Sequence, residues 1–208
     1  DGGAYISNNG GSSWSKFLNL PITQFYNIEV DYQNPERRYG GTQDNNTIRT
    51  TTGGLNDWNS ILGGDGFHVN VDPIDNNYVY AESQYGNLRR STNGGNSFQN
   101  GTNGISGSDR VNWNTPVILS PFSPDKMFYG SNKLYTSTRA VSWTAISPDL
   151  TDGLHPSGSL AFGTLTAIAA SYNNLDVIYT GSDDGNVNVT FDGGTTWTDI
   201  SAGLPDQY

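Results

Sequence analysis

Cysteine is absent from this 208-residue chain, and basic residues and long apolar runs are scarce. Without cysteine the chain has no disulfide, no thiolate metal ligand and no cysteine nucleophile. No apolar run approaches the roughly 20 residues that a membrane-spanning helix needs, so we expect no membrane insertion. The chain carries 10 Lys or Arg residues against 20 Asp or Glu, and its net charge of −10 argues against nucleic acid or an anionic membrane as a partner.

The 3.6-residue apolar periodicity of an amphipathic helix is also missing from every window. Turn-forming residues are abundant instead, with 26 glycines and many Asn, Ser and Thr residues. Aromatic residues make up 12% of the chain, which is too many for a disordered protein. The composition therefore predicts an all-β fold with many short strands and turns.

One eight-residue pattern occurs three times. It consists of a small hydroxyl residue, a spacer, Asp or Asn, two glycines, a spacer, Ser or Thr, and a large aromatic residue. Its members are Ser7, Asn9, Gly10, Gly11 and Trp14 in the first copy, Ser91, Asn93, Gly94, Gly95 and Phe98 in the second, and Thr190, Asp192, Gly193, Gly194 and Trp197 in the third. The pattern predicts a hairpin turn that the Asp or Asn side chain fastens to backbone N–H groups. The glycines supply positive φ angles, and the aromatic residue begins the returning strand and packs inward.

Two weaker copies lie between the complete ones. Residues 50–58 keep the glycine pair with one extra residue, and residues 136–143 keep only the ends of the pattern. The five aromatic residues stand at positions 14, 58, 98, 143 and 197, so their spacings are 44, 40, 45 and 54 residues. A period of roughly 40 to 50 residues with several short strands per unit is typical of a β-propeller built from four-stranded blades.

The three complete copies resemble the Asp-box, also called the BNR repeat, of sialidases, sortilin-type receptors, xyloglucanases and many secreted bacterial proteins. The resemblance covers nearly the whole chain and implies a β-propeller of four-stranded antiparallel blades with Asp-box hairpins. It further implies a sortilin-like or xyloglucanase-like secreted bacterial protein, placed extracellularly or at the cell surface. We expect the Asp-box residues to form structural turns on the outer rim of the blades. The competing interpretation is a surface contact with a glycan or a protein.

Taken in order, the chain predicts half a blade over 1–22 and full blades over about 23–64, 65–109, 110–153 and 157–203. The first and second strands of the last unit, within 165–171 and 177–181, are near-continuous apolar runs, which indicates strands covered on both faces. Because both ends fall inside the repeat, we expect a partial propeller that is a segment of a longer protein. Alternatively, other copies of the chain supply strands and build an assembly or filament.

Two aspartates are the candidate catalytic residues. Asp44 lies in the turn 41–46 and Asp65 in the glycine-rich segment 63–67, and both segments resemble ones that recur in Asp-box proteins. Two carboxylates in one cleft are what a glycosidase needs for acid and base. The competing interpretation is that both are turn-capping aspartates among glycines.

Exposed aromatic residues are the candidate ligand-binding residues. We expect Tyr85 in a turn, Trp113 in the loop before a blade and Tyr26 near a strand start to stack on sugars. Gln43, Asp44 and Asp65 are further candidate ligand-binding residues. Packing between blades is the competing interpretation. Three Asn-x-Ser/Thr sequons, at Asn45, Asn100 and Asn188, permit glycosylation.

The sequence does not contain the residue patterns of a catalytic triad, a metal site or a sialidase site. The two histidines, His68 and His155, have no sequence neighbours typical of a catalytic triad or a metal site, so we expect no metal and no cofactor. The seven arginines do not form the pattern of a sialidase site.

Three functions remain open. The first is a secreted or cell-surface interaction module that binds a polysaccharide or a protein, or serves as a structural subunit of an extracellular assembly. The second is a fragment of a xyloglucanase-like glycoside hydrolase, and the third is a propeller that assists assembly of a membrane complex. The sequence favours a non-enzyme.

Overall fold

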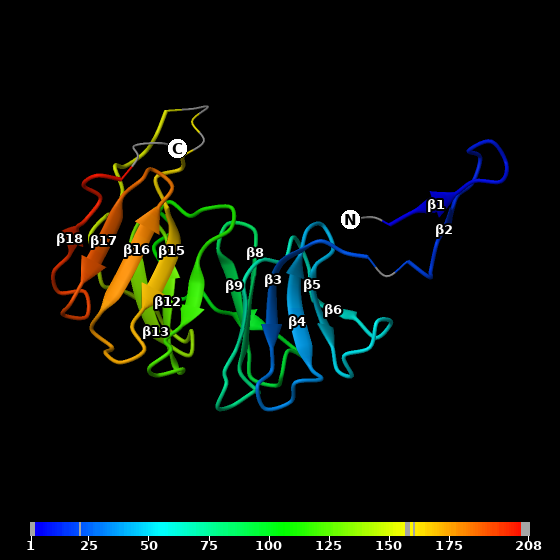
Figure 1. Cartoon of the computed structure of the whole chain (residues 1–208), viewed down its shortest axis with the longest axis horizontal. Helices are drawn as coiled ribbons and strands as arrows, with labels where there is room; N and C mark the ends of the chain where they lie inside the picture. The colour runs from blue at the N-terminus through cyan, green and yellow to red at the C-terminus, as the bar shows by residue number, and fades with distance from the viewer. Residues whose placement is uncertain (1–2, 21, 157–158, 160, 205–208) are drawn as a thin grey trace.

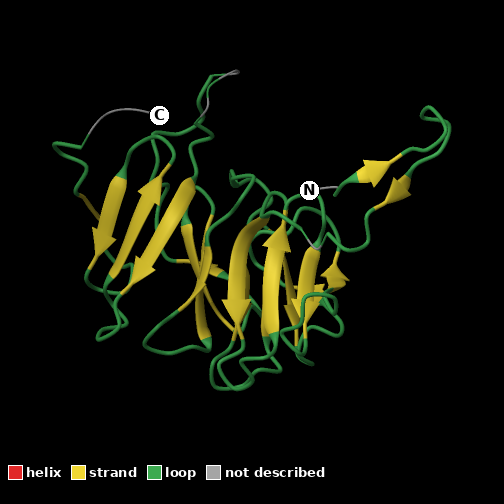
Figure 2. Cartoon of the chain, turned by 45° about the vertical axis from the view of Figure 1, so that its right-hand side comes forward, coloured by secondary structure: helices red, strands yellow, loops and turns green. Residues whose placement is uncertain are grey.

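Among the residues that the structure describes, every regular element is a β-strand. The computed structural model describes residues 3–20, 22–156, 159 and 161–204 (Figures 1 and 2). Within these residues no helix is long and apolar enough to cross a membrane. Four antiparallel, four-stranded sheets follow one another along the chain as blades of a β-propeller, and the strand order in each sheet is the chain order. The all-β propeller predicted from the repeat is confirmed.

The strands have the following bounds. The first blade contains β3 (Phe25–Val30), β4 (Arg38–Thr42), β5 (Thr47–Thr50) and β6 (Asn59–Leu62), and the second contains β7 (Val69–Val71), β8 (Val79–Ser83), β9 (Asn87–Ser91) and β10 (Gln99–Asn100). The third blade contains β11 (Val117–Leu119), β12 (Lys126–Gly130), β13 (Leu134–Thr138) and β14 (Thr144–Ala145), and the fourth contains β15 (Leu165–Ala170), β16 (Ile178–Ser182), β17 (Val187–Thr190) and β18 (Thr198–Asp199). A separate hairpin is formed by β1 (Tyr5–Ile6) and β2 (Ser15–Lys16).

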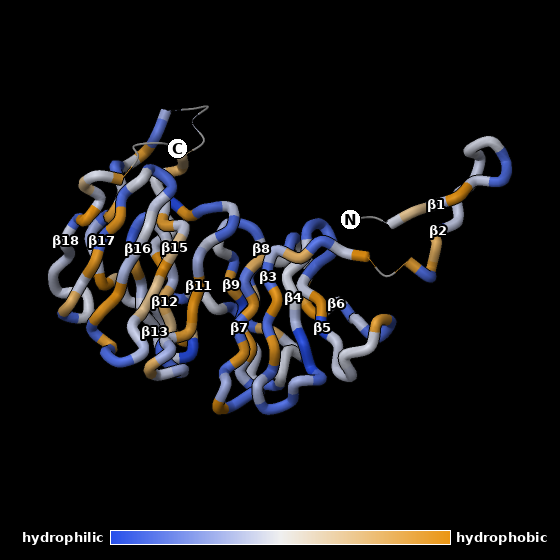
Figure 3. The backbone as a smooth tube through the Cα atoms, viewed as in Figure 1, coloured by the Kyte–Doolittle hydropathy of each residue, from blue (hydrophilic) through white to orange (hydrophobic). Residues whose placement is uncertain are grey.

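This up-and-down strand order gives the propeller two different ends. One end, which we call the connection end, is formed by the turns between second and third strands and by the links between blades. The turns are 43–46, 84–86, 131–133 and 183–186. The described parts of the links are 63–68, 101–116, 146–156 and 161–164. The hairpin end carries the turns after the first strands, which include 31–37, 72–78, 120–125 and 171–177, and the third-to-fourth hairpins. Hydrophobic residues recur along the strands, whereas the turns at both ends are largely hydrophilic (Figure 3).

The core lies between neighbouring blades. Tyr39 of the first blade packs with Val69, Val71 and Val79 of the second, with Phe98 against them. Between the second and third blades, Tyr80 and Leu88 pack against Tyr129 and Trp143. A third cluster joins the third and fourth blades, and its members are Phe128, Leu134, Leu150, Leu165 and Ile178. Each blade is therefore held chiefly by its neighbours, as in other repeat architectures.

Hydrogen bonds within the hairpin turns hold their conformation. In the second blade Asn93 Oδ1 accepts the N–H groups of Asn96 (3.1 Å) and Ser97 (3.0 Å), while Ser91 Oγ accepts the N–H of Gly95 (2.9 Å). Gly94 and Gly95 both have positive φ. The turn with Asp192 repeats this geometry, and bonds from Thr196 lower the pKa of the Asp192 carboxyl to about 2. The hydrogen bonds fix the path of the chain from the third strand into the fourth.

Asn93→Ala is expected to lower the free energy of unfolding by about 1 kcal/mol, because the turn loses its acceptor while the exposed N–H groups can bond water instead. Urea unfolding of the variant against the wild type measures the change. A loss above about 3 kcal/mol, or a change in ligand binding at the connection end, would contradict a purely structural role for this turn.

Two sequence predictions are wrong. Trp14 does not pack inward but is 63% exposed, because among the described residues β1 pairs only with β2 and the hairpin projects from the blades (Figure 1). The strands of the fourth blade are not covered on both faces. Ile168 and Ile178 face the third blade, whereas Tyr179 on the opposite face is 41% exposed, since no described sheet packs there.

The weaker copy at 136–143 is closer to the pattern than its residues suggest. Arg139 and Ala140 occupy the glycine positions and still have positive φ, 53° and 50°. Arg139 places its guanidinium 3.9 Å from the ring centre of Tyr78, and Trp143 donates its Nε1–H to Gly101 O (2.6 Å). These contacts with the preceding blade hold a turn that lacks glycine. The expected start of the last blade at residue 157 lies outside the described residues.

Candidate functional site at the connection end

The two candidate aspartates lie next to each other. The turn 43–46 of the first blade runs beside the segment 63–67 that leads to the second, and Asp65 Oδ1 accepts the backbone N–H of Asp44 at 2.5 Å. Asp65 Oδ2 accepts the side-chain amide of Gln84 (3.1 Å) from the corresponding turn of the second blade. Asp65 is buried and Asp44 is exposed. Both Asp65 oxygens therefore serve to clamp three segments, and Asp44 is the carboxylate that faces solvent.

Three residues of this region have a backbone conformation that side chains disfavour. Asp44 has φ 57°, Asn46 has φ 74° and Tyr85 has φ 58°. Asp and Asn tolerate the left-handed region, but a bulky aromatic residue there is an outlier. Tyr85 N–H donates to Trp113 O (3.1 Å), a contact that holds the turn 84–86 against the link between the second and third blades. Strain of this kind gathers at functional sites, where the surrounding structure maintains it.

The predicted aromatic residues form one cluster. The rings of Tyr85 and Trp113 meet edge-on at 4.9 Å, Trp113 meets Phe67 at 5.9 Å, and Phe67 meets Tyr26 at 4.7 Å between ring centres. Phe67 is buried, whereas Tyr85 is 59% exposed and Trp113 38% exposed. Phe67 thus forms the floor, and three partly exposed rings from two blades and one link stand above it. We call Tyr26, Phe67, Tyr85 and Trp113 the aromatic cluster.

A buried carboxyl group lies beneath the cluster. Glu82, the fourth residue of β8, accepts the backbone N–H of Thr115 through Oε1 (2.8 Å), and its Oε2 has no hydrogen-bond partner in the described part of the chain. Burial raises the pKa of Glu82 to about 8, despite backbone N–H groups that lower it. This side chain fixes the segment that carries Trp113, which lies two residues before Thr115. Glu82 is therefore a positioning residue and has no access to a ligand.

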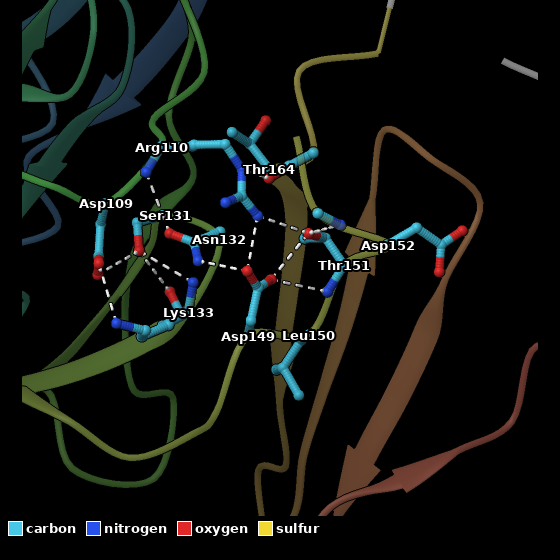
Figure 4. Close-up of polar contacts among 12 residues, drawn as sticks. Asp109, Arg110, Ser131, Asn132, Lys133, Asp149, Leu150, Thr151, Asp152 and Thr164 are labelled. Atoms are coloured by element: carbon cyan, nitrogen blue, oxygen red, sulfur yellow. Dashed lines mark hydrogen bonds and ion pairs between the residues drawn. The ribbon is translucent and has the colours of Figure 1, made fainter. Parts of the chain in front are cut away.

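Polar side chains elsewhere at this end satisfy one another. Arg110 donates to Asp149 (2.7 Å), to Thr151 (2.9 Å) and to Gly163 O (3.0 Å), and Asn132 donates to Asp149 (2.8 Å; Figure 4). In the same view Lys133 Nζ lies 2.9 Å from Asp109. These bonds join the links that enter and leave the third blade. Because each charge already has a partner, the network is a structural joint between blades.

The remaining candidates differ in accessibility. Gln43 is half-buried in the turn beside Asp44, and its N–H donates to Gln24 O (2.9 Å). Of the sequons, Asn100 is exposed, Asn45 is half-buried, and Asn188 is buried with its amide donating to Leu150 O (3.2 Å). Asn188 therefore has no room for a glycan in the folded chain.

Within the described residues no group of three or more His, Asp or Glu side chains is arranged to hold a metal ion.

The fold matches solved structures of GH74 enzymes. An ancestral GH74 enzyme superposes with a TM-score of 0.68 at 21% identity over 99% of this chain, and the GH74 xyloglucanase of Xanthomonas campestris with 0.64 at 18% over 88%. The GH74 enzyme of Niastella koreensis gives a TM-score of 0.53 at 18% identity over 95% of the chain.

The chain spans only 29%, 31% and 42% of these three proteins. At such identities the likeness establishes the β-propeller fold and nothing finer. No protein-family model matches the chain, and no curated protein matches it.

The sequence indicates the exposed members of the site but not the residues that hold them, which are Phe67, Glu82 and Gln84. A signal for Glu82 was present, because an acidic residue inside the run 78–82 of strand-forming residues is unusual in a buried strand. The contacts of Phe67 and Gln84 with other blades leave no mark in the local sequence.

Proposed function

We propose that the aromatic cluster and the turn 43–46 form a carbohydrate-binding surface of a secreted or cell-surface interaction module. The observation that supports it best is the convergence of Tyr26, Tyr85 and Trp113 beside an exposed carboxylate, from segments far apart in the sequence. Exposed aromatic rings offer apolar faces for the C–H faces of sugar rings, and the turn offers hydrogen-bonding groups for hydroxyls. The strained backbone at Tyr85 projects one of these rings.

A glycoside hydrolase is the second candidate, because Asp44 and Asp65 are adjacent and Asp44 is exposed. Catalysis by this pair would need Asp65 free to exchange a proton or attack a sugar carbon. Both its oxygens instead accept hydrogen bonds from Asp44 N–H and Gln84. Binding without hydrolysis is the function that this arrangement supports better.

Affinity gel electrophoresis with soluble xyloglucan, galactomannan and dextran tests the proposal. We expect at least one polysaccharide to retard the wild-type chain. Tyr85→Asn and Trp113→Ala should each weaken binding about tenfold or more, equivalent to about 1.4 kcal/mol. Asn tolerates the left-handed backbone of position 85, so the first variant removes the ring and keeps the turn.

Tyr172→Ala, an exposed tyrosine at the hairpin end, is the matched control and should bind as the wild type does. Equal retardation of all four proteins, or none with any of the three polysaccharides, would contradict the proposal. Release of reducing ends from a bound polysaccharide, abolished by Asp44→Asn, would favour the hydrolase instead.

A further inference from the structure

A second concave region lies at the opposite end of the propeller from the aromatic cluster. It has a volume of about 500 Å³ and is lined by the ends of the first strands and by the turns that follow them. Its lining comes from all four blades: Glu29 and Tyr32 from the first, Val71 and Pro73 from the second, Ile118, Pro121 and Pro124 from the third, and Tyr172 from the fourth. We call it the hairpin-end pocket.

The wall of this pocket combines apolar side chains with the polar side chains of Asn70 and Ser120 and one carboxyl group, that of Glu29. Glu29 is half-buried, and its Oε1 accepts the backbone N–H of Val30 at 3.2 Å. Across the described chain no Lys, Arg or His forms an ion pair with it. Burial raises the pKa of Glu29 to about 7, against a smaller lowering by the Val30 N–H. A carboxyl group in apolar surroundings without a cationic partner is costly to ionise.

The charges near Glu29 are already matched. Asp31, at the end of β3, pairs with Arg37 (2.5 Å), and Asp72, at the end of β7, lies 3.7 Å from Arg139. Opposite Glu29 in the sheet stands Tyr39, a buried phenol whose own pKa burial raises. The other titratable groups of the pocket wall are the phenols of Tyr32 and Tyr172. Glu29 is thus the one lining carboxyl group.

The rim of the pocket consists of tyrosine and proline side chains. Tyr32 and Tyr172 are 71% and 78% exposed, and Pro73, Pro121 and Pro124 provide flat apolar surface between them. Tyrosine rings attract a cation to their faces, and a carboxylate provides its counter-charge. The chain as a whole has a net charge of −10, which raises the local concentration of a basic partner.

We infer that the hairpin-end pocket binds a lysine side chain presented by a protein segment, with the butyl chain along the apolar wall and the ammonium group at Glu29. A segment of protein, and not a free amine, fits the extended rim of tyrosine and proline surfaces, which would contact the residues on either side of the lysine. This inference does not depend on carbohydrate binding at the other end.

Binding of the ammonium group should ionise Glu29 and release a proton, because an opposite charge favours the carboxylate. The affinity should therefore rise as the pH rises from 6 to 8, by at most tenfold per pH unit below the pKa of the free site. Above about pH 8 the free site is already ionised and the affinity should level off.

Titration calorimetry at pH 6, 7 and 8 with the capped peptide acetyl-Pro-Ala-Lys-Ala-Pro-amide tests this inference. The comparison ligands are the same peptide with norleucine in place of lysine, and n-butylamine. We expect the lysine peptide to bind at least tenfold more tightly than either at pH 8. Glu29→Gln should remove that advantage and the pH dependence, while Asp44→Asn at the other end should change neither.

Equal binding of the lysine and norleucine peptides would overturn the inference, as would a Glu29→Gln variant that binds the lysine peptide as the wild type does. Binding of n-butylamine as tight as that of the peptide would overturn the assignment to a protein segment. Circular dichroism of Glu29→Gln should match the wild type, which separates loss of binding from loss of fold.

Discussion

Gly41→Ala is expected to destabilise the protein by at least about 3 kcal/mol, because the added methyl group would meet backbone atoms that cannot yield. A Cβ atom at position 41 would lie 2.1 Å from Phe67 O and 2.5 Å from Gly66 C, far inside van der Waals contact. Gly66 is equally confined, since its own Cβ would lie 2.8 Å from Gly41 Cα. The backbones of the first blade and of the link to the second therefore touch directly.

The cost is high because backbone atoms cannot rotate away as a side chain can. Overpacking a well-packed interior costs about 1–3 kcal/mol when side chains yield, and more when they cannot. Relief at position 41 requires the first and second blades to move apart, which also displaces Asp65 and the aromatic floor at Phe67. The unfolding midpoint in urea, followed by circular dichroism, measures the loss.

Gly107→Ala is the matched control, because a Cβ atom there meets nothing within 4 Å and the residue is exposed. Its stability should differ from that of the wild type by no more than about 1 kcal/mol. A Gly41→Ala variant as stable as Gly107→Ala would contradict the close contact between the two blades.

Glu82→Gln is expected to make the protein more stable at pH 8.5 by a few kcal/mol and nearly unchanged at pH 4.5. The pKa of Glu82 is about 8 in the folded chain and 4.5 in the unfolded chain, so folding favours the protonated form. The stability of the wild type is therefore greatest below the unfolded pKa and falls as the pH rises toward 8, by at most about 1.4 kcal/mol per pH unit.

Glutamine has no proton to lose and keeps an oxygen that can accept the Thr115 N–H. Urea unfolding of both proteins between pH 4.5 and 9 measures the difference, which should grow through this range. Glu36→Gln is the control, because Glu36 is exposed in the turn 31–37. A difference between wild type and Glu82→Gln that is independent of pH would contradict burial of Glu82 as a neutral group.

Sequence alone predicted the propeller because its signal is local and repeated. Each complete copy of the turn carries its own acceptor, glycines and aromatic residue, as the bonds of Asn93 and Asp192 show. The copy at 50–58 also holds its turn with an aspartate, but this acceptor follows the glycine pair. Asp57 accepts the hydroxyls of Thr50 (2.6 Å) and Thr52 (2.7 Å), and these bonds lower the pKa of its carboxyl to about 2. Because the acceptor lies at a different position, the eight-residue pattern does not identify it.

The candidate site was predictable only in part. Exposed aromatic residues in turns, such as Tyr85 and Trp113, are visible in the sequence as residues that a turn does not need. Their convergence on Phe67 depends on how one blade is rotated against the next, which no local pattern records. For the same reason the sequence could place Asp44 and Asp65 in turns but could not show that one carboxylate binds the other residue's N–H group.

The most direct test of the carbohydrate-binding surface uses the five tryptophans as reporters. Trp113 belongs to the aromatic cluster, whereas Trp143 donates its Nε1–H to Gly101 O between blades and Trp197 donates to Ile146 O. Trp14 lies in the projecting hairpin, and Trp58 packs against Phe25 at 5.6 Å. In a ¹⁵N–¹H spectrum, adding the polysaccharide that retards the chain should shift the indole signal of Trp113 and leave the other four in place. A shift of Trp14, Trp58 or Trp197 with Trp113 unmoved would contradict the proposed surface.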